Sequence, residues 1–159
     1  QPLTLTDGSM TRFLMTLDDA VDLVFFAFSK GKNGDILVQK SPASTMTDLT
    51  NALLKSIKQE KYKVGHIGLR HGEKMFEVLL TREEKSIASD LGKFYRVPAD
   101  NRDLNYEKYF SEGSFSYKNA EEYNSNNTKI LNEAQVLKIL QKLPIIKEFN
   151  KSGIAGEGF

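Results

Sequence analysis

An alternation of strand-like and helix-like segments over residues 1–98 is the feature that most constrains the fold. The segments "PLTLTDG" and "TRFLMT" (Thr11 to Thr16) read as short strands, since apolar and polar residues alternate and a turn signal follows the first. Further strands are predicted around Leu37 and at "YKVGHIG". Helical segments separate these strands, so the pattern predicts an α/β (α+β) layer structure.

The helices in this alternation begin with the same capping signal. Thr16 is followed three residues later by Asp19, and Thr45 by Asp48, which is the spacing of a capping box. The body of the first helix, 17–29, is apolar on nearly every side, so we expect it to be buried. The second helix is amphipathic, with one apolar stripe at helical spacing: Met46, Leu49, Leu53 and Ile57.

The composition and the hydrophobic periodicity of the sequence change beyond this alternating region. Residues 99–131 are rich in Asn, Asp, Ser, Tyr and Glu without a sustained period, which predicts an irregular arm, either disordered or laid over another surface. A last helix is predicted over 132–146, capped by Asn132 with Gln135. The Gly-rich end, 147–159, is predicted to be a flexible tail.

Composition narrows the classes of function. The chain has 159 residues and a formal net charge of +1, which gives no reason to expect nucleic-acid binding. It has no cysteines, and its histidines are His66 and His71, so thiolate catalysis is excluded and a metal site is disfavoured. The apolar run "AVDLVFFAF" is too short to cross a bilayer, and we expect no membrane contact and a cytoplasmic location. Because the chain begins without Met, we expect it to be a piece of a longer protein.

The stretch "IGLRHGEKMFEVLL" holds the clearest candidate site. From Glu73 onward it reads as the start of a helix, with Arg70 just ahead and Gly72 permitting close backbone approach. Helix N-termini attract anions, an arginine there suits phosphate oxygens, and the carboxylate of Glu73 can accept from sugar hydroxyls. The alternative is a surface ion pair between Arg70 and Glu73 that contributes almost nothing to stability.

A second arginine, Arg12, lies at the start of a predicted strand, close to core segments. An arginine in this setting needs a partner, because unpaired burial is costly. The residues alone favour an ion pair with Asp18, Asp19 or Asp22. Asp18 and Asp19 are explained by their place in a first helical turn, so we assign them a structural role.

Other candidate constellations are negative. Gly65, Gly68 and Gly72 follow a strand, but their spacing does not fit the dinucleotide-binding fingerprint. His66 and His71 have no nearby Ser and Asp pattern that would form a triad. We therefore predict no catalytic residue and no metal ligand in this chain.

Several blocks of the sequence nevertheless resemble one enzyme family. "PLTLTDG", "MTRFLMTLDDAVDLV" and "RHGEKMFEVLL" are similar to the C-terminal half of bacterial polysaccharide-biosynthesis nucleotide-sugar enzymes, which are extended short-chain dehydrogenase/reductases. The tail blocks "RDLNY" and "EYNSNNT" narrow the resemblance to the UDP-N-acetylglucosamine 4,6-dehydratase/5-epimerase group, which supplies precursors of capsule and O-antigen. The match covers roughly residues 1–146.

The resemblance implies a role for individual residues in binding a UDP-sugar substrate. Carried over by position, Arg12 and Arg70 bind the diphosphate, and Glu73 takes the ribose hydroxyls. Residues 1–98 would then form the nucleotide-sugar substrate-binding region. The strand that lies where the uracil is held consists of Leu3, Thr4 and Leu5.

The same resemblance places the cofactor elsewhere. In such enzymes NAD(P) belongs to an N-terminal Rossmann half, and the glycine-rich turn and the Tyr-x-x-x-Lys pair of that half are absent from this sequence. We therefore expect this chain to bind no cofactor and to be inactive alone. The resemblance also implies that the intact enzyme is a homo-oligomer, with the arm and the last helix on a neighbouring subunit.

Two interpretations from other classes stay open. A free-standing nucleotide- or phosphate-binding module needs only the same arginines. A structural or oligomerisation domain is favoured by the aromatic residues of the arm.

Overall fold

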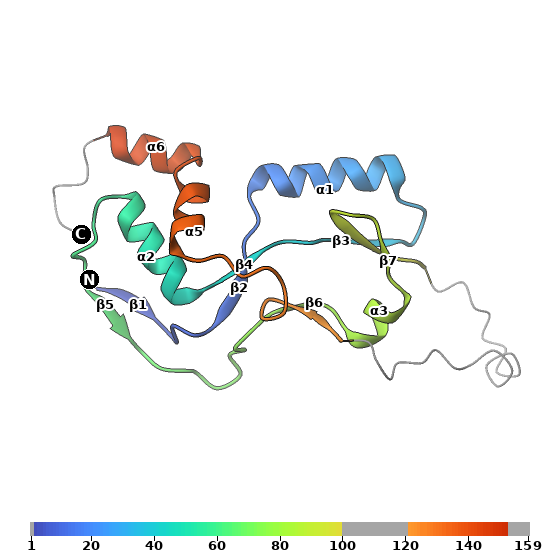
Figure 1. The fold of residues 1–159 in the computed structure, drawn as a ribbon, viewed down its shortest axis with the longest axis horizontal. Helices are drawn as coiled ribbons and strands as arrows, with labels where there is room; N and C mark the ends of the chain where they lie inside the picture. The colour runs from blue at the N-terminus through green and yellow to red at the C-terminus, as the bar shows by residue number, and fades with distance from the viewer. Residues whose placement is uncertain (1, 100–120, 153–159) are drawn as a thin grey trace, which may run out of the picture. The chain divides into compact units, whose positions relative to one another are not determined.

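The computed structural model describes residues 2–99 and 121–152 and shows short strands and helices in mixed order (Figure 1). The predicted mixed α/β class is confirmed. The described chain forms two compact units, each assembled from segments that are distant in the sequence. Unit 1 comprises residues 1–14, 42–77 and 125–159, and unit 2 comprises residues 15–41 and 78–124.

Unit 1 holds two pairs of strands. β1 (Leu3–Leu5) pairs in parallel with β5 (Val64–His66), and β2 (Thr11–Phe13) pairs antiparallel with β4 (Ala43–Thr45). The strands predicted in "PLTLTDG", "TRFLMT" and "YKVGHIG" are thus confirmed. β4 was not predicted, because "AST" is too short and polar to show a strand period.

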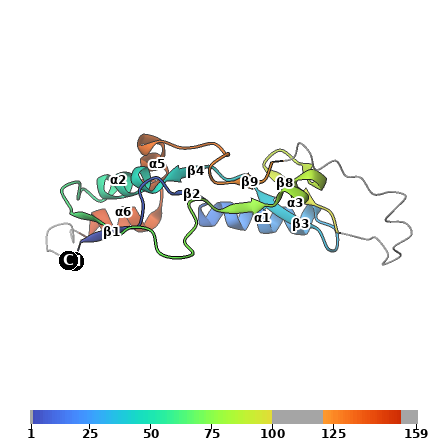
Figure 2. The same cartoon turned by 90° about the horizontal axis from the view of Figure 1, so that it is seen from below.

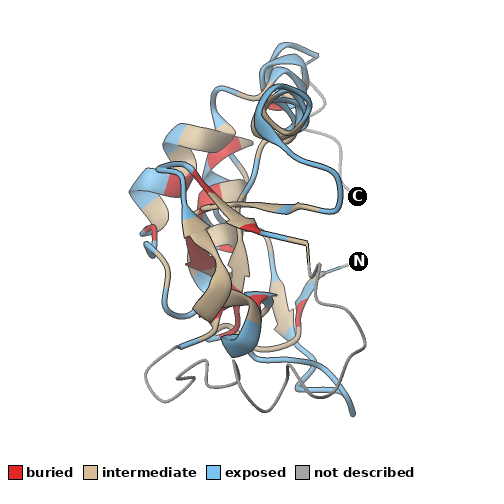
Figure 3. Cartoon of the chain, turned by 90° about the vertical axis from the view of Figure 1, so that its right-hand side faces the viewer, coloured by how far each residue is buried: buried red, intermediate tan, exposed pale blue. Residues whose placement is uncertain are grey.

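The helices of unit 1 are α2 (Met46–Ser56), α5 (Glu133–Leu140) and α6 (Pro144–Lys151). α2 packs against α5, and both labels lie together in Figure 2 as in Figure 1. Their contact forms a core cluster whose buried members are among the red residues of Figure 3. The buried core residues are Ala52, Leu131 and Val136, and the partly buried residues packed against them are Leu14, Leu49, Leu137, Ile139 and Leu140.

The predicted start of α5 is confirmed, whereas the predicted end of the helical region is not. Asn132 and Gln135 form the predicted capping box of α5. Residues 147–151, predicted as part of a flexible tail, instead form the second half of α6. The reason is Pro144: its fixed φ suits the first position of a helix, so it starts α6 as well as following α5.

Unit 2 contains a three-stranded antiparallel sheet in the order β3-β8-β7. Its strands are β3 (Ile36–Gln39), β8 (Phe94–Val97) and β7 (Ser89–Asp90). A separate antiparallel pair joins β6 (Val78–Leu80) to β9 (Tyr123–Asn124). The strand centred on Leu37 is therefore confirmed.

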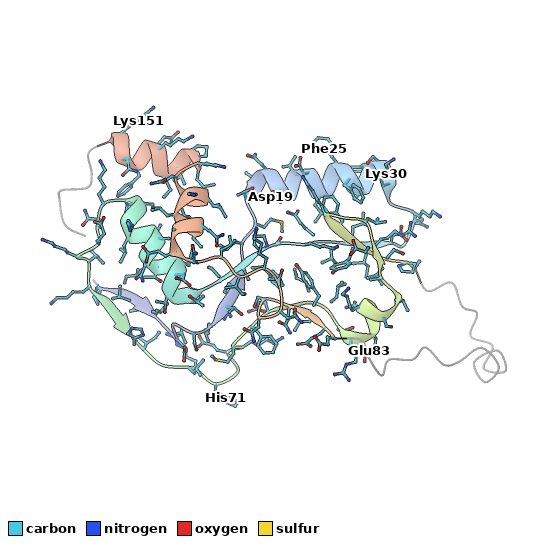
Figure 4. All side chains as sticks on the ribbon, viewed as in Figure 1. Asp19, Phe25, Lys30, His71, Glu83 and Lys151 are labelled. Carbon is cyan, nitrogen blue, oxygen red and sulfur yellow. The ribbon has the colours of Figure 1, made fainter. Side chains whose placement is uncertain are left out.

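α1 (Leu17–Lys30) packs on β3, and the ring of Phe26 stacks on that of Phe94 with centroids 4.2 Å apart. The expectation that α1 is buried is wrong, since none of its residues is buried. The sequence is apolar on two sides, but only the side toward the sheet is covered by described residues; Figure 4 labels Phe25 on the other side. The exposed apolar residues of α1, which we call the α1 stripe, are Leu17, Val21, Val24, Phe25 and Phe28.

The helix predicted to start at Glu73 is also absent. The chain there makes turns and then enters β6, and the next helix, α3 (Arg82–Ile87), begins only after Thr81. Thr81 and Glu84 form a complete capping box, which was the readable signal for this helix. Pairing of β6 with a strand more than forty residues away overrides the helical period of "EKMFEVLL".

The predicted irregular arm is described only at its ends. Residues 100–120 lie outside the described residues. The end of the arm differs from the prediction, because Tyr123, Asn124 and Ser125 are buried within their own chain. Ile130 adds a bridge to Ala43 of β4.

Candidate functional site

The predicted uracil strand and the segment that leads to Arg70 are neighbours in unit 1. β1 and β5 pair in register, with Leu3 opposite Val64 and Leu5 opposite His66. The ladder continues past β5, since the Ile67 N–H donates to the carbonyl of Leu5 at 3.0 Å. Leu5 is buried, whereas the side chain of Thr4 is exposed. Thr4 is therefore the member of the strand that is open to a ligand.

The loop that carries Arg70 and Glu73 is a turn closed on itself. The carboxylate of Glu73 accepts from the backbone N–H of Arg70 at 3.0 Å, and the Glu73 N–H donates to the Arg70 carbonyl at 3.1 Å. Gly72 adopts a φ of +87°, which favours glycine, and a Cβ there would meet nothing within 4 Å. The loop thus presents an open surface, and Figure 4 labels His71 at its outer edge.

The guanidinium of Arg70 is available to a ligand. Every residue from His66 to Met75 is exposed. Among the described residues, no ion pair or side-chain hydrogen bond involves the guanidinium of Arg70, so the predicted alternative of an Arg70–Glu73 side-chain pair is not what the loop forms. An exposed guanidinium with free N–H donors can bind a phosphate oxygen pair.

Arg12 is tied to the same loop through backbone carbonyls. Its Nη2 donates to the carbonyl of Lys74 at 3.0 Å and its Nη1 to that of Met75 at 3.4 Å. The backbone agrees with this attachment, since the Thr11 N–H donates to the Met75 carbonyl at 2.9 Å. The structure therefore joins the strand of Arg12 to the end of the loop that carries Arg70 and Glu73.

The acidic partner of Arg12 is Glu77. Its Nε lies 3.6 Å from Oε1 of Glu77, and the two side chains are 29% and 46% exposed. The predicted ion pair with Asp18, Asp19 or Asp22 is wrong, because Asp19 is used by the cap of α1. Sequence spacing could not identify Glu77, which lies on a different segment of unit 1.

Asp7, in the turn after β1, has a structural role. Hydrogen bonds from the Ser9 hydroxyl and the Ser9 N–H lower the pKa of Asp7, with a smaller contribution from the charge of His66. Asp7 therefore stabilises the turn after β1 as a carboxylate acceptor. Across residues 2–99 and 121–152, no group of His, Asp and Glu is arranged to hold a metal ion.

A fully buried serine completes the region and was missed as an individual residue by sequence reasoning. Ser125 bonds to both Thr11 and Glu77, the neighbours of Arg12 in space. Only the block "EYNSNNT" pointed to this segment, and it did so through resemblance.

The glycines after β5 do not form a dinucleotide-binding turn. Gly68 and Gly72 follow β5 and have positive φ, but the chain continues into a turn and β6. A phosphate-binding glycine turn needs a helix N-terminus directly after the strand, and none follows β5. No step of a reaction can be assigned to a nicotinamide held by these residues.

Comparison with known proteins adds a family to this geometry. Residues 1–99 match the family described as polysaccharide biosynthesis protein, and residues 100–147 match the family described as polysaccharide biosynthesis protein C-terminal. None of the helices in the described ranges is long and apolar enough to span a membrane.

Individual relatives are similar over most of this chain. It is 53% identical over 146 residues to a UDP-glucose 4-epimerase of Rickettsia akari (strain Hartford), covering 92% of this chain and 42% of that relative. The UDP-glucose 4-epimerase of Rickettsia canadensis (strain McKiel) is 50% identical with the same coverage. The structure of Pen from Bacillus thuringiensis is similar with a TM-score of 0.70 and 28% identity, covering 87% of this chain and 39% of that one. The chain thus spans about two fifths of the length of these proteins.

Proposed function

Because the chain belongs to the polysaccharide biosynthesis protein family, we propose that it is the substrate-binding portion of a nucleotide-sugar enzyme and that it binds UDP. The observation that carries this proposal is the attachment of Arg12 to the carbonyls of Lys74 and Met75, which holds the loop of Arg70 and Glu73 beside β1. In this arrangement the diphosphate is bound by Arg70 and Arg12.

Arg70 is the first contact of the diphosphate in this proposal, since its guanidinium is exposed. Arg12 contributes its positive charge beside this loop, while its Nη atoms keep the carbonyls of Lys74 and Met75 and its Nε keeps Glu77. Glu73 accepts from the ribose hydroxyls, and the uracil lies along Leu3, Thr4 and Leu5. Binding of the diphosphate by these positive charges then holds the sugar close to the reacting groups of the enzyme.

The test is a calorimetric titration of the chain with UDP and with uridine. We expect Arg70→Ala and Arg12→Ala to weaken UDP binding about 10-fold or more, since a hydrogen bond to a charged group contributes ~1.5–3 kcal/mol. Uridine binding should be nearly unchanged in Arg70→Ala, because uridine has no phosphate. Arg82→Ala is the matched control, as Arg82 is an exposed arginine of unit 2.

The same titration separates the alternatives. If the wild-type chain does not bind UDP, the proposal is wrong and a structural or oligomerisation domain becomes the better interpretation. If UDP binds with equal affinity in Arg70→Ala and in wild type, the assigned diphosphate site is wrong. A free-standing nucleotide-binding module would give the same titration result. The two interpretations differ in whether the chain functions alone or as part of a longer polypeptide.

For the longer polypeptide we propose 4,6-dehydration and 5-epimerisation of UDP-N-acetylglucosamine, with NAD(P) bound outside this chain. The named relatives make 4-epimerisation of UDP-glucose the competing reaction. Mass spectrometry of the product separates them, because dehydration removes one water while epimerisation leaves the mass unchanged. We expect the chain alone to give neither product with added NAD⁺, and turnover by it would contradict the division of labour proposed here.

The intact enzyme is proposed to be a homo-oligomer. Light scattering of the full-length protein tests this, and a monomer would contradict it.

A further inference from the structure

Ser125 and Thr11 form a buried hydroxyl pair. Their side-chain oxygens lie 2.8 Å apart, and the side chains are 0% and 5% exposed. The Ser125 hydroxyl donates to the Thr11 carbonyl at 3.0 Å, so the hydroxyl of Thr11 donates to that of Ser125. A hydroxyl that is buried with several partners is costly to remove.

The same serine also binds the residue that faces Arg12. The Ser125 hydroxyl accepts from the Glu77 N–H at 3.0 Å, and the Ser125 N–H donates to the Glu77 carbonyl at 2.8 Å. Ser125 thus links Thr11, which precedes Arg12 in β2, to Glu77, whose carboxylate pairs with Arg12.

Arg12 is held from both of these sides. Its Nη1 donates to the Thr11 carbonyl at 2.8 Å, which is the oxygen that also accepts from Ser125. Its Nε pairs with Glu77. Displacement of Thr11 or Glu77 would therefore move the guanidinium directly.

We propose that Ser125 is a positioning residue that sets the guanidinium of Arg12 for the diphosphate of the ligand. This inference rests on the proposed UDP site. It gives the block "EYNSNNT" a role in substrate binding that acts through Arg12, since Ser125 itself is fully buried.

The experiment compares UDP and uridine affinities of Ser125→Ala with those of the wild-type chain. Loss of the hydroxyl leaves the Glu77 N–H and the Thr11 hydroxyl without their partner, and Arg12 moves. We expect UDP affinity to fall about 5-fold, since a hydrogen bond contributes roughly 1 kcal/mol, while uridine affinity is unchanged. A merely structural loss would weaken both ligands together.

Ser44→Ala is the matched control. Ser44 is also 0% exposed, lies opposite Arg12 in the β2–β4 register, and its hydroxyl has no hydrogen-bond partner among the described residues. This variant should bind UDP as the wild type does. Thr11→Val removes one hydroxyl of the pair and keeps a β-branched residue in the strand, so it serves if Ser125→Ala does not fold.

A second measurement reads the position of Arg12 without a ligand. The NMR signal of the Arg12 Nε–H should shift in Ser125→Ala or Thr11→Val and stay in place in Ser44→Ala. If wild type binds UDP but the Ser125 and Thr11 variants leave both the affinity and this signal unchanged, the inference fails and the proposed function stands. If wild type does not bind UDP, the proposed function fails first and the positioning role falls with it.

Discussion

The α2–α5 contact of unit 1 and the α1 stripe of unit 2 are built from similar apolar residues and meet different surroundings. In the first, Ala52, Leu131 and Val136 are at most 5% exposed. In the second, Leu17 is 80% exposed and Phe28 is 86% exposed. An apolar helix sequence therefore predicts that the helix has a face to bury. It does not predict which of its apolar faces packs against the rest of the same chain.

The comparison predicts unequal costs for shortening an apolar side chain. Leu131→Ala should lower the free energy of unfolding by about 2–5 kcal/mol, because it leaves a cavity in a packed core. Urea unfolding followed by circular dichroism, with hydrogen exchange to report on each unit, measures the loss. Ile130→Ala is the control, since Ile130 is the neighbouring residue and 42% exposed. Equal losses for both variants would show that the core is not centred on Leu131.

A smaller effect is expected at the start of α1. Hydrogen bonds from the Thr16 hydroxyl and the Thr16 N–H lower the pKa of Asp19. A lowered folded-state pKa means that the stabilisation is present above the unfolded pKa of about 3.9 and is lost as pH falls through the folded value. Asp19→Asn should therefore be less stable than wild type at pH 7, and the difference should shrink as pH falls below about 4.

Thermal unfolding of both chains from neutral to acidic pH measures this dependence. Asp18→Asn is the control, because Asp18 is exposed and is not the carboxylate of the capping box. A wild-type advantage that is constant with pH would exclude the Asp19 carboxylate as its source.

The smallest effect should come from the α1 stripe. Leu17→Ala should change the free energy of unfolding by no more than about 0.5 kcal/mol, as is usual for exposed positions. Urea unfolding under the conditions used for Leu131→Ala measures it. A loss of the same size as for Leu131→Ala would break the comparison, since it would mean that the stripe is covered in solution.

Local chemistry could be predicted from the sequence, and non-local pairing could not. The boxes of Thr16 with Asp19 and of Asn132 with Gln135 are confirmed, since capping depends on residues three positions apart. The helix from Glu73 is wrong, because a strand pairing with a distant segment decides that stretch. Thr81 and Glu84 have the same three-residue spacing and mark the start of α3.

The candidate site divides in the same way. The turn of Arg70 and Glu73 is local, and the sequence placed both residues together. The attachment of Arg12 to Lys74 and Glu77 depends on how unit 1 folds, so its partner was predicted wrongly. The resemblance to polysaccharide-biosynthesis enzymes is confirmed at the level of the family, while the roles of the individual residues stay predictions.

Each unit is built from segments that are distant in the sequence, and this limits when unit 1 can fold during synthesis. Leu14 packs against a cluster whose other members include Leu131 and Val136, so the core of unit 1 cannot form before residues 131–140 have been synthesised. A polypeptide that ended at the boundary between the two family segments, at residue 100, would therefore lack five of the eight residues of this core cluster. A truncation or gene fusion should therefore keep residues 1–14, 42–77 and 125–152 in one polypeptide, even though a family boundary lies at residue 100.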